Sequence, residues 1–225
     1  MARSKEFTRK LTILGLLSAI AFILASLVRI PLVPVVGFLG YEPKDVILVI
    51  AGFIFGPFAP LIMITVIALL EGVTTSVLGP VGIPMNFIAS VSFCCTAAAI
   101  YKKWRTLLGA AVGLAVGVVV MTVCMLLWNY ALTPILMGWP REQVEVLLMP
   151  GFLPFNLIKG TLNAAIAMLL YKPVRMALAR ARLLPKSEDS PESVEAGKVN
   201  VGALLVSALI ILTLTLVVLS WQGVI

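Results

Sequence analysis

The chain has 225 residues, of which 61% are hydrophobic and only 12% are charged, and its formal net charge is +7. A water-soluble domain cannot bury so large an apolar fraction, so the composition excludes that class and predicts an all-α integral membrane protein. Histidine is absent, and Cys94, Cys95 and Cys124 lie in apolar stretches without metal-ligand spacing, which argues against a metal site, a disulfide framework or redox chemistry.

Apolar stretches follow one another along the chain, and most are long enough to form membrane-spanning helices, because about 20 residues cross ~30 Å of hydrocarbon. The second stretch is short, so its helix is expected to begin upstream near Tyr41 or to pack behind protein rather than face lipid. The first is expected to be a retained helix, because no clear signal-peptidase site follows it. The stretches are residues 11–30, 46–55, 60–78, 83–100, 107–127, 152–171 and 201–221.

Basic residues cluster in alternate connections, which is the distribution that sets membrane orientation and explains the net charge without nucleic acid. Lysines and arginines precede the first stretch and follow the fourth and the sixth, so the N-terminus is predicted to be cytoplasmic. The opposite connections hold mixed or acidic charge: Glu42, Lys44 and Asp45 in the first, and Arg141, Glu142 and Glu145 in the long one. We therefore expect a six-helix membrane domain over residues 1–182, a polar cytoplasmic linker over 183–200, and an additional transmembrane helix over 201–225.

Two kinds of sequence signal are missing. The helical stretches show no clear internal repeat, which weakens the case for an inverted-repeat secondary transporter. The chain also has no G-x-x-x-x-G-K-[ST] loop to cradle a nucleotide phosphate. Any ATP-driven work would therefore come from a partner.

Glu71 and Lys159 are the ionisable residues inside the predicted spans, where such residues usually face a bundle interior or an aqueous cavity. Counting residues from the outer helix ends places both at a similar depth. One interpretation is a buried ion pair that fixes helix packing. The other is a ligand site, because Asn156, Lys159 and Asn163 fall at i, i+3 and i+7 and share one helical face. Such a ladder suits a neutral heterocycle, although Asn163 alone could instead serve interhelical hydrogen bonding.

Further polar residues gather at the same outer level. WNYALTP closes the fifth predicted helix and contains Asn129, and GPVGIPMNF delivers Asn86 at the start of the fourth. Trp128 and Tyr130 fit an interfacial aromatic belt better than a ligand platform. The first outer loop, RIPLVPVVGFLGYEPKD, contains prolines and glycines that stiffen and turn it, and it could be an ordinary connection or a lid over the site.

Small residues recur at helical spacing in the first stretch, as Gly15 and Ala19 and as Ala21 and Ala25. Small side chains allow helices to approach closely. On the pattern alone, packing within the bundle is favoured over an intermolecular surface.

Several segments together resemble the riboflavin-specific substrate-binding subunits, or S components, of energy-coupling factor (ECF) vitamin transporters. The likeness extends over residues 11–173, and LPFNLIKG is its most specific part. The other segments are GLLSAIAFILA, EPKD, FIFGPFAP, GPVGIPMNFIAS, WNYALTPILMG and LLYKP.

The resemblance implies a six-helix bundle in a bacterial cell membrane that binds riboflavin from outside. It also implies docking on a membrane coupling subunit that is driven by two cytoplasmic ATPase subunits. Asn156, Lys159 and Asn129 match the residues that hold the flavin. On the first helix, Gly15 and Ala19 or neighbours such as Ala21 would contact the coupling subunit. The seventh stretch and an acid at position 71 depart from the family pattern.

The sequence therefore predicts a riboflavin-binding transport component that is not an enzyme and needs no cofactor. The expected substrate-binding set is Asn156, Lys159, Asn129, Asn163, Asn86 and Glu71. If Glu71 neutralises Lys159, the flavin contacts would be rearranged. The alternatives are an S component for another heterocyclic vitamin and a self-sufficient transporter coupled to protons through Glu71. A membrane-embedded enzyme is disfavoured, because the spans hold no cluster of catalytic groups.

Overall fold

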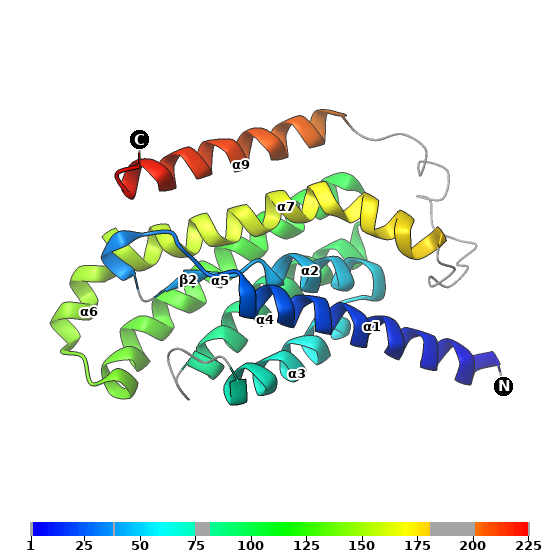
Figure 1. Cartoon of the computed structure of the whole chain (residues 1–225), viewed down its shortest axis with the longest axis horizontal. Helices are drawn as coiled ribbons and strands as arrows, with labels where there is room; N and C mark the ends of the chain where they lie inside the picture. The colour runs from blue at the N-terminus through cyan, green and yellow to red at the C-terminus, as the bar shows by residue number, and fades with distance from the viewer. Residues whose placement is uncertain (1, 38, 75–81, 181–200, 225) are drawn as a thin grey trace.

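The computed structural model describes residues 2–37, 39–74, 82–180 and 201–224, and these residues are almost entirely helical (Figure 1). Most of the helices form one bundle, and a further helix near the C-terminus packs against the outside of that bundle. This arrangement confirms the predicted six-helix bundle with a seventh membrane helix; the predicted linker, residues 183–200, lies outside the described residues. The bundle helices are α1 (Ala2–Leu27), α2 (Lys44–Phe55), α3 (Phe58–Thr74), α4 (Gly82–Lys103), α5 (Leu107–Met137) and α7 (Leu153–Arg180), and the outer helix is α9 (Val201–Trp221).

Helix α2 is the short apolar segment, and it packs in the middle of the bundle against α1, α3, α4 and α7. Its residues are buried almost throughout, which confirms that it packs behind protein. The helix begins at Lys44, so Lys44 and Asp45 are not loop charges as the sequence predicted but buried residues of its first turn. Gly56, with φ of +88°, ends α2 in a conformation that favours glycine and turns the chain directly into α3.

Helix α5 continues to Met137, ten residues beyond its predicted end. The Thr106 side chain caps its start by accepting a hydrogen bond from the Gly109 N–H at 3.0 Å. At its other end the helix runs through Pro134 and stops at Gly138, which is left-handed with φ of +69°. The segment WNYALTP, expected to close this helix, therefore lies within it.

The connection between α5 and α7 contains structure that the sequence analysis missed. A short helix, α6 (Arg141–Leu147), is followed by a π-helical turn (Leu148–Phe152) that leads directly into α7. Only Val144 of α6 is buried. Pro150 lies in the π turn and has no N–H to donate, so a regular α-helical hydrogen bond cannot form there.

The first outer loop folds into a small hairpin. Strand β1 (Ile30–Pro31) pairs antiparallel with β2 (Gly40–Tyr41), and a 3₁₀ turn (Pro34–Val36) lies between them. Val36 is fully buried against the π turn, where a Cβ added to Gly151 would lie 2.7 Å from a Val36 methyl group. Glycine at position 151 therefore lets the hairpin seat closely on the entrance to α7.

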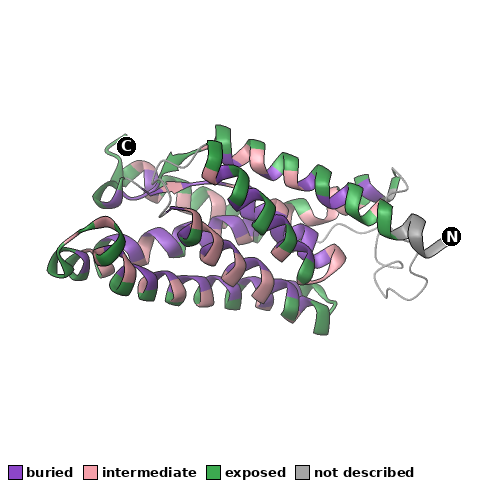
Figure 2. Ribbon diagram, turned by 90° about the horizontal axis from the view of Figure 1, so that it is seen from below, coloured by how far each residue is buried: buried purple, intermediate pink, exposed green. Residues whose placement is uncertain are grey.

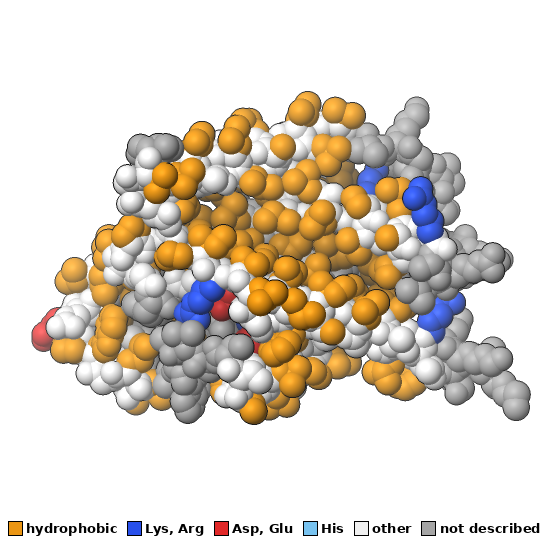
Figure 3. All heavy atoms as spheres, viewed as in Figure 1, with side chains coloured by type: hydrophobic (Ala, Val, Ile, Leu, Met, Phe, Trp, Pro, Cys, Tyr) orange, Lys and Arg blue, Asp and Glu red, His pale blue; other side chains and the backbone are white. Residues whose placement is uncertain are grey.

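The outer surface of the bundle is apolar. Buried residues line the inner faces of the helices, while exposed residues face outward (Figure 2). Hydrophobic side chains cover the middle of the face shown in Figure 3. Within the described ranges, five helical segments are long and apolar enough to cross a membrane, and α3 is a shorter apolar helix. The chain is a multi-pass membrane protein, because only lipid can solvate such a surface.

Candidate functional site

A pocket lies between the helix ends at one end of the bundle, where the hairpin meets α1, α3, α4, α5 and α7. It brings together five of the six predicted substrate-binding residues: Asn86, Asn129, Asn156, Lys159 and Glu71. The remaining lining residues are Ala25, Ser26, Arg29, Leu39, Gly40, Glu42, Gly82, Ile83, Met85, Ala89, Met125 and Phe155.

The polar face of α7 is buried as a unit, because Asn156, Lys159 and Asn163 are all at most 5% exposed. Asn156 and Lys159 line the pocket. Asn163 lies one turn further into the bundle, where its amide donates to the carboxylate of Asp45 at 3.4 Å. Asn163 is therefore placed to hold other helices, as its alternative interpretation proposed, and does not line the pocket.

Lys159 presents a buried ammonium to the pocket. Across the described ranges it has no hydrogen-bond or ion-pair partner in the protein. Burying a charged group without a partner costs free energy, so a lysine in this state is expected to serve a ligand. Its three N–H donors are available to an acceptor that enters the pocket.

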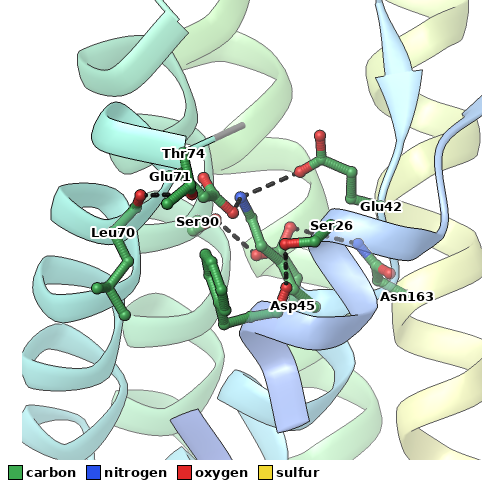
Figure 4. Close-up of polar contacts among 10 residues, drawn as sticks. Ser26, Glu42, Asp45, Leu70, Glu71, Thr74, Ser90 and Asn163 are labelled. Carbon is green, nitrogen blue, oxygen red and sulfur yellow. Dashed lines mark hydrogen bonds and ion pairs between the residues drawn. The ribbon is translucent and has the colours of Figure 1, made fainter. Parts of the chain in front are cut away.

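Glu71 pairs with Lys44 and not with Lys159. The Lys44 Nζ lies 2.5 Å from Glu71 Oε1 and 3.0 Å from Glu42 Oε2, and Figure 4 shows the Glu42 and Glu71 side chains close together. The ion pair that the sequence suggested between Glu71 and Lys159 is therefore wrong.

Asp45 lies beside this cluster and ties three helices together (Figure 4). It is fully buried in α2, and its two carboxylate oxygens accept from Ser90 of α4 at 2.5 Å and from Asn163 of α7 at 3.4 Å. Its backbone carbonyl accepts from the Cys94 thiol at 3.6 Å. These bonds satisfy a buried carboxylate and fix α4 and α7 relative to α2 just behind the pocket.

The asparagine amides of the pocket are oriented by their own helices. Asn129 donates to the Met125 carbonyl at 2.7 Å and accepts from the Thr133 hydroxyl at 3.0 Å. Asn156 donates to the Phe152 carbonyl at 2.8 Å. Each amide keeps a second N–H, and the Asn156 oxygen remains available as an acceptor. The aromatic neighbours Trp128 and Tyr130, expected to belong to an interfacial belt, are not among the lining residues.

Several pocket residues escaped the sequence analysis, chiefly Arg29 and Glu42 at the hairpin. The Arg29 side chain passes over Gly40, where an added Cβ would collide with it. Next to Gly40, the Tyr41 phenol is buried, and burial, followed by the negative charge of Asp45, raises its pKa so that it keeps its proton. The charge-rich EPKD motif at the start of the short apolar helix was the signal that could have located Glu42.

The pocket and the polar cluster behind it are balanced in charge. Arg29, Lys44 and Lys159 are matched by Glu42, Asp45 and Glu71. The pocket surface also contains apolar side chains from the hairpin and from α4, α5 and α7. This combination suits a neutral, flat, polar-edged molecule. Among the described residues, no group of His, Cys, Asp or Glu side chains could hold a metal ion.

The small residues of α1 divide into two sets. Gly15 and Ala19 are exposed, and a Cβ added to Gly15 would meet nothing within 4 Å. Ala21 is 0% exposed and Ala25 is also buried, so these two pack inside the bundle. The prediction that Ala21 contacts a coupling subunit is therefore corrected, because no partner can reach it in this conformation.

Comparison with known proteins gives a consistent result. The family model for the substrate-specific component of ECF transporters matches residues 9–171. The chain is 34% identical over 178 residues to the riboflavin transporter RibU of Staphylococcus aureus (strain TCH60), covering 76% of this chain and 93% of the relative. It is 30% identical over 172 residues to the riboflavin transporter FmnP of Bacillus subtilis (strain 168), covering 72% and 90%.

A solved structure has a similar fold. The S component of a bacterial ECF transporter superposes with a TM-score of 0.66 at 35% sequence identity, covering 76% of this chain and 98% of that chain. Helix α9, which begins at Val201, lies beyond the residues that the family model matches.

Proposed function

The chain belongs to the family of ECF transporter substrate-specific components, and from this premise we propose that it captures riboflavin in the pocket described above. The observation that carries the proposal is the buried Lys159, which has no partner among the described residues and lies in one pocket with the oriented amides of Asn129 and Asn156. Two relatives that are at least 30% identical to this chain over the aligned residues are named riboflavin transporters. As a transport component, the chain is not an enzyme.

Riboflavin matches the chemistry of the pocket. The pyrimidine edge of its flavin ring has two carbonyl oxygens, which would accept from the Lys159 ammonium and from asparagine N–H groups. Its ring N–H would donate to the free oxygen of Asn156. Met85, Met125 and Phe155 are apolar lining residues that would cover the dimethylbenzene part of the ring.

A fluorescence titration tests this proposal directly. Riboflavin fluorescence should be quenched on addition of the purified protein in detergent, with saturation at micromolar ligand or below. Asn156→Ala should weaken binding, whereas Thr161→Ala, a change on the same helix outside the pocket lining, should leave it unchanged. Competition by a panel of other heterocyclic vitamins separates riboflavin from its alternatives. Absence of quenching at micromolar ligand overturns the proposal.

We further propose that delivery requires a membrane coupling subunit of the EcfT type and two cytoplasmic ATPase subunits. Family membership supports this division of labour. The exposed Gly15 and Ala19 on α1 offer a surface of small side chains for close helix contact, as the family resemblance implied.

Bulky substitutions on α1 should therefore separate uptake from binding. Gly15→Trp combined with Ala19→Trp should reduce riboflavin uptake by cells at least tenfold, because the indoles would hold the partner helix away. Riboflavin affinity of the purified variant should stay within about twofold, since Gly15 has open space around it. Val123→Trp, at an exposed position on α5, is the control that should retain uptake. If Val123→Trp loses uptake while the double variant on α1 retains it, this docking surface is contradicted.

We propose that the N-terminus is cytoplasmic and that the pocket faces outward. On the face in Figure 3, Lys and Arg side chains gather mainly at the N-terminal end, which favours that end as the cytoplasmic one. The chain would comprise the six-helix domain (1–182), a cytoplasmic linker (183–200) and the extra helix (201–225). In Figure 1 the two termini lie at opposite ends of the molecule.

This topology predicts an asymmetric accessibility of the two ends. An epitope tag after Ile225 should be labelled by antibody on intact protoplasts, whereas a tag before Met1 should be labelled only after permeabilisation. Equal labelling of both tags on intact protoplasts would show that the chain crosses the membrane an even number of times.

A further inference from the structure

Helix α9 lies beyond the residues that the family model matches, yet it packs against the bundle. It packs along α7, and the two helices lie side by side in Figure 1. Within α9 only Ser207 and Val218 are buried, so most of its surface faces lipid. The small contact with the core suggests that α9 has a role other than completing the bundle.

The end of α9 is fixed by its own sequence. Gly223, with φ of +71°, adopts the left-handed conformation that favours glycine, and its N–H bonds to the Ser220 carbonyl at 3.1 Å. The N–H of Val224 bonds to the Leu219 carbonyl at 3.0 Å, which completes a Schellman motif. Gln222 is therefore the capping residue that directly follows Trp221, the last residue of α9.

Gln222 joins this helix end to the hairpin at the pocket. Its side-chain Nε2 donates to the backbone carbonyl of Pro31 at 2.6 Å, across 191 positions of sequence. Pro31 pairs with Gly40 in the two-stranded ladder, and Gly40 with its neighbour Leu39 lines the pocket. The Gln222 hydrogen bond is thus linked to the pocket wall through the paired residues Pro31 and Gly40.

We propose that Gln222 is a positioning residue and that α9 clamps the hairpin over the pocket, which slows the exchange of bound ligand. The hairpin is also held through Val36, in the turn between its strands, which is buried against Gly151. With both attachments in place the hairpin cannot swing outward without breaking one of them. This inference rests on the proposed function for the identity of the ligand but not for the existence of the clamp.

The first test measures riboflavin release. Protein preloaded with riboflavin is mixed rapidly with an excess of a non-fluorescent competitor, and the recovery of flavin fluorescence gives the dissociation rate. Gln222→Ala should accelerate release about three- to tenfold, the change expected for loss of one hydrogen bond. Gln222→Lys keeps a donor of similar reach and should restore slow release. Thr215→Ala, which removes only a bond within α9, should behave like the parent chain.

The second test needs no ligand. Leu39→Cys places a thiol at a buried position of the hairpin, and its rate of reaction with a maleimide reports hairpin opening. Adding Gln222→Ala should speed this labelling by a similar factor, after subtraction of the signal from the three native cysteines.

The outcomes are distinct. If neither rate responds to Gln222→Ala, or if bound riboflavin leaves Gln222→Lys as fast as it leaves Gln222→Ala, the clamp is overturned. If riboflavin does not bind at all but labelling accelerates, the proposed function fails while the clamp stands. If riboflavin binds and only the Gln222 variants lacking a donor release it faster, both are supported.

Discussion

A Lys159→Met variant should bind riboflavin about 10- to 100-fold more weakly than the parent chain. A hydrogen bond to a charged group contributes roughly 1.5–3 kcal/mol, and each 1.4 kcal/mol changes a dissociation constant about tenfold. Methionine fills a similar volume and removes only the ammonium, so the loss measures the charged donor rather than a cavity. Titration of flavin fluorescence, or calorimetry in detergent, gives the two dissociation constants.

The same substitution should stabilise the ligand-free protein. Lys159 is 5% exposed and has no partner across the described ranges, so the parent chain bears the desolvation cost of its charge. Removing that cost should raise the melting temperature of the ligand-free form by about 2–4 °C for each kcal/mol recovered. A binding residue that lowers the stability of the ligand-free protein is an example of the trade-off between stability and function.

Lys102→Met is the matched control, because this lysine is exposed near the end of α4 and outside the pocket lining. It should change neither riboflavin affinity nor melting temperature. If Lys159→Met lowers the melting temperature as well as the affinity, the ammonium is satisfied within the empty protein. Unchanged affinity would remove Lys159 from the site.

The helices could be predicted because length and hydropathy determine whether a segment can cross a bilayer. The misplaced boundaries have physical causes. Trp128 and Tyr130 suggested a membrane interface, but α5 continues through Pro134, because membrane helices tolerate a proline when neighbouring groups replace the lost hydrogen bond. Helix α6 is seven residues long with a single buried side chain, so its sequence has too little apolar periodicity to distinguish it from a loop.

Which polar residues share one face could be predicted only within a single helix. Helical periodicity placed Asn156, Lys159 and Asn163 on one face because those relations are local. The partner of Glu71 was not predictable in this way, since matching depth in the membrane does not determine which helices face each other. Lys44, 27 residues earlier, reaches Glu71 because α2 is buried at the centre of the bundle, a property of tertiary packing.

Lys44→Met should lower the free energy of unfolding by about 3–5 kcal/mol, because removing one partner of a buried ion pair leaves the other charge uncompensated. Here one ammonium neutralises two carboxylates, those of Glu42 and Glu71. Without it, two buried acids face each other between the start of α2 and the end of α3. Unfolding by sodium dodecyl sulfate in mixed micelles, followed by tryptophan fluorescence, measures the difference.

The arrangement also predicts an asymmetry between the partners. Glu71→Gln should cost only about 1 kcal/mol, because Lys44 keeps Glu42 at 3.0 Å and the new amide oxygen can still accept from its ammonium. In the double variant Lys44→Met with Glu71→Gln, Glu42 is the one side chain of these three that stays charged, and it lines the pocket. The double variant should therefore be more stable than Lys44→Met alone, although a second substitution usually lowers the free energy of unfolding further. Equal destabilisation by Lys44→Met and Glu71→Gln would instead indicate an isolated pair in which Glu42 takes no part.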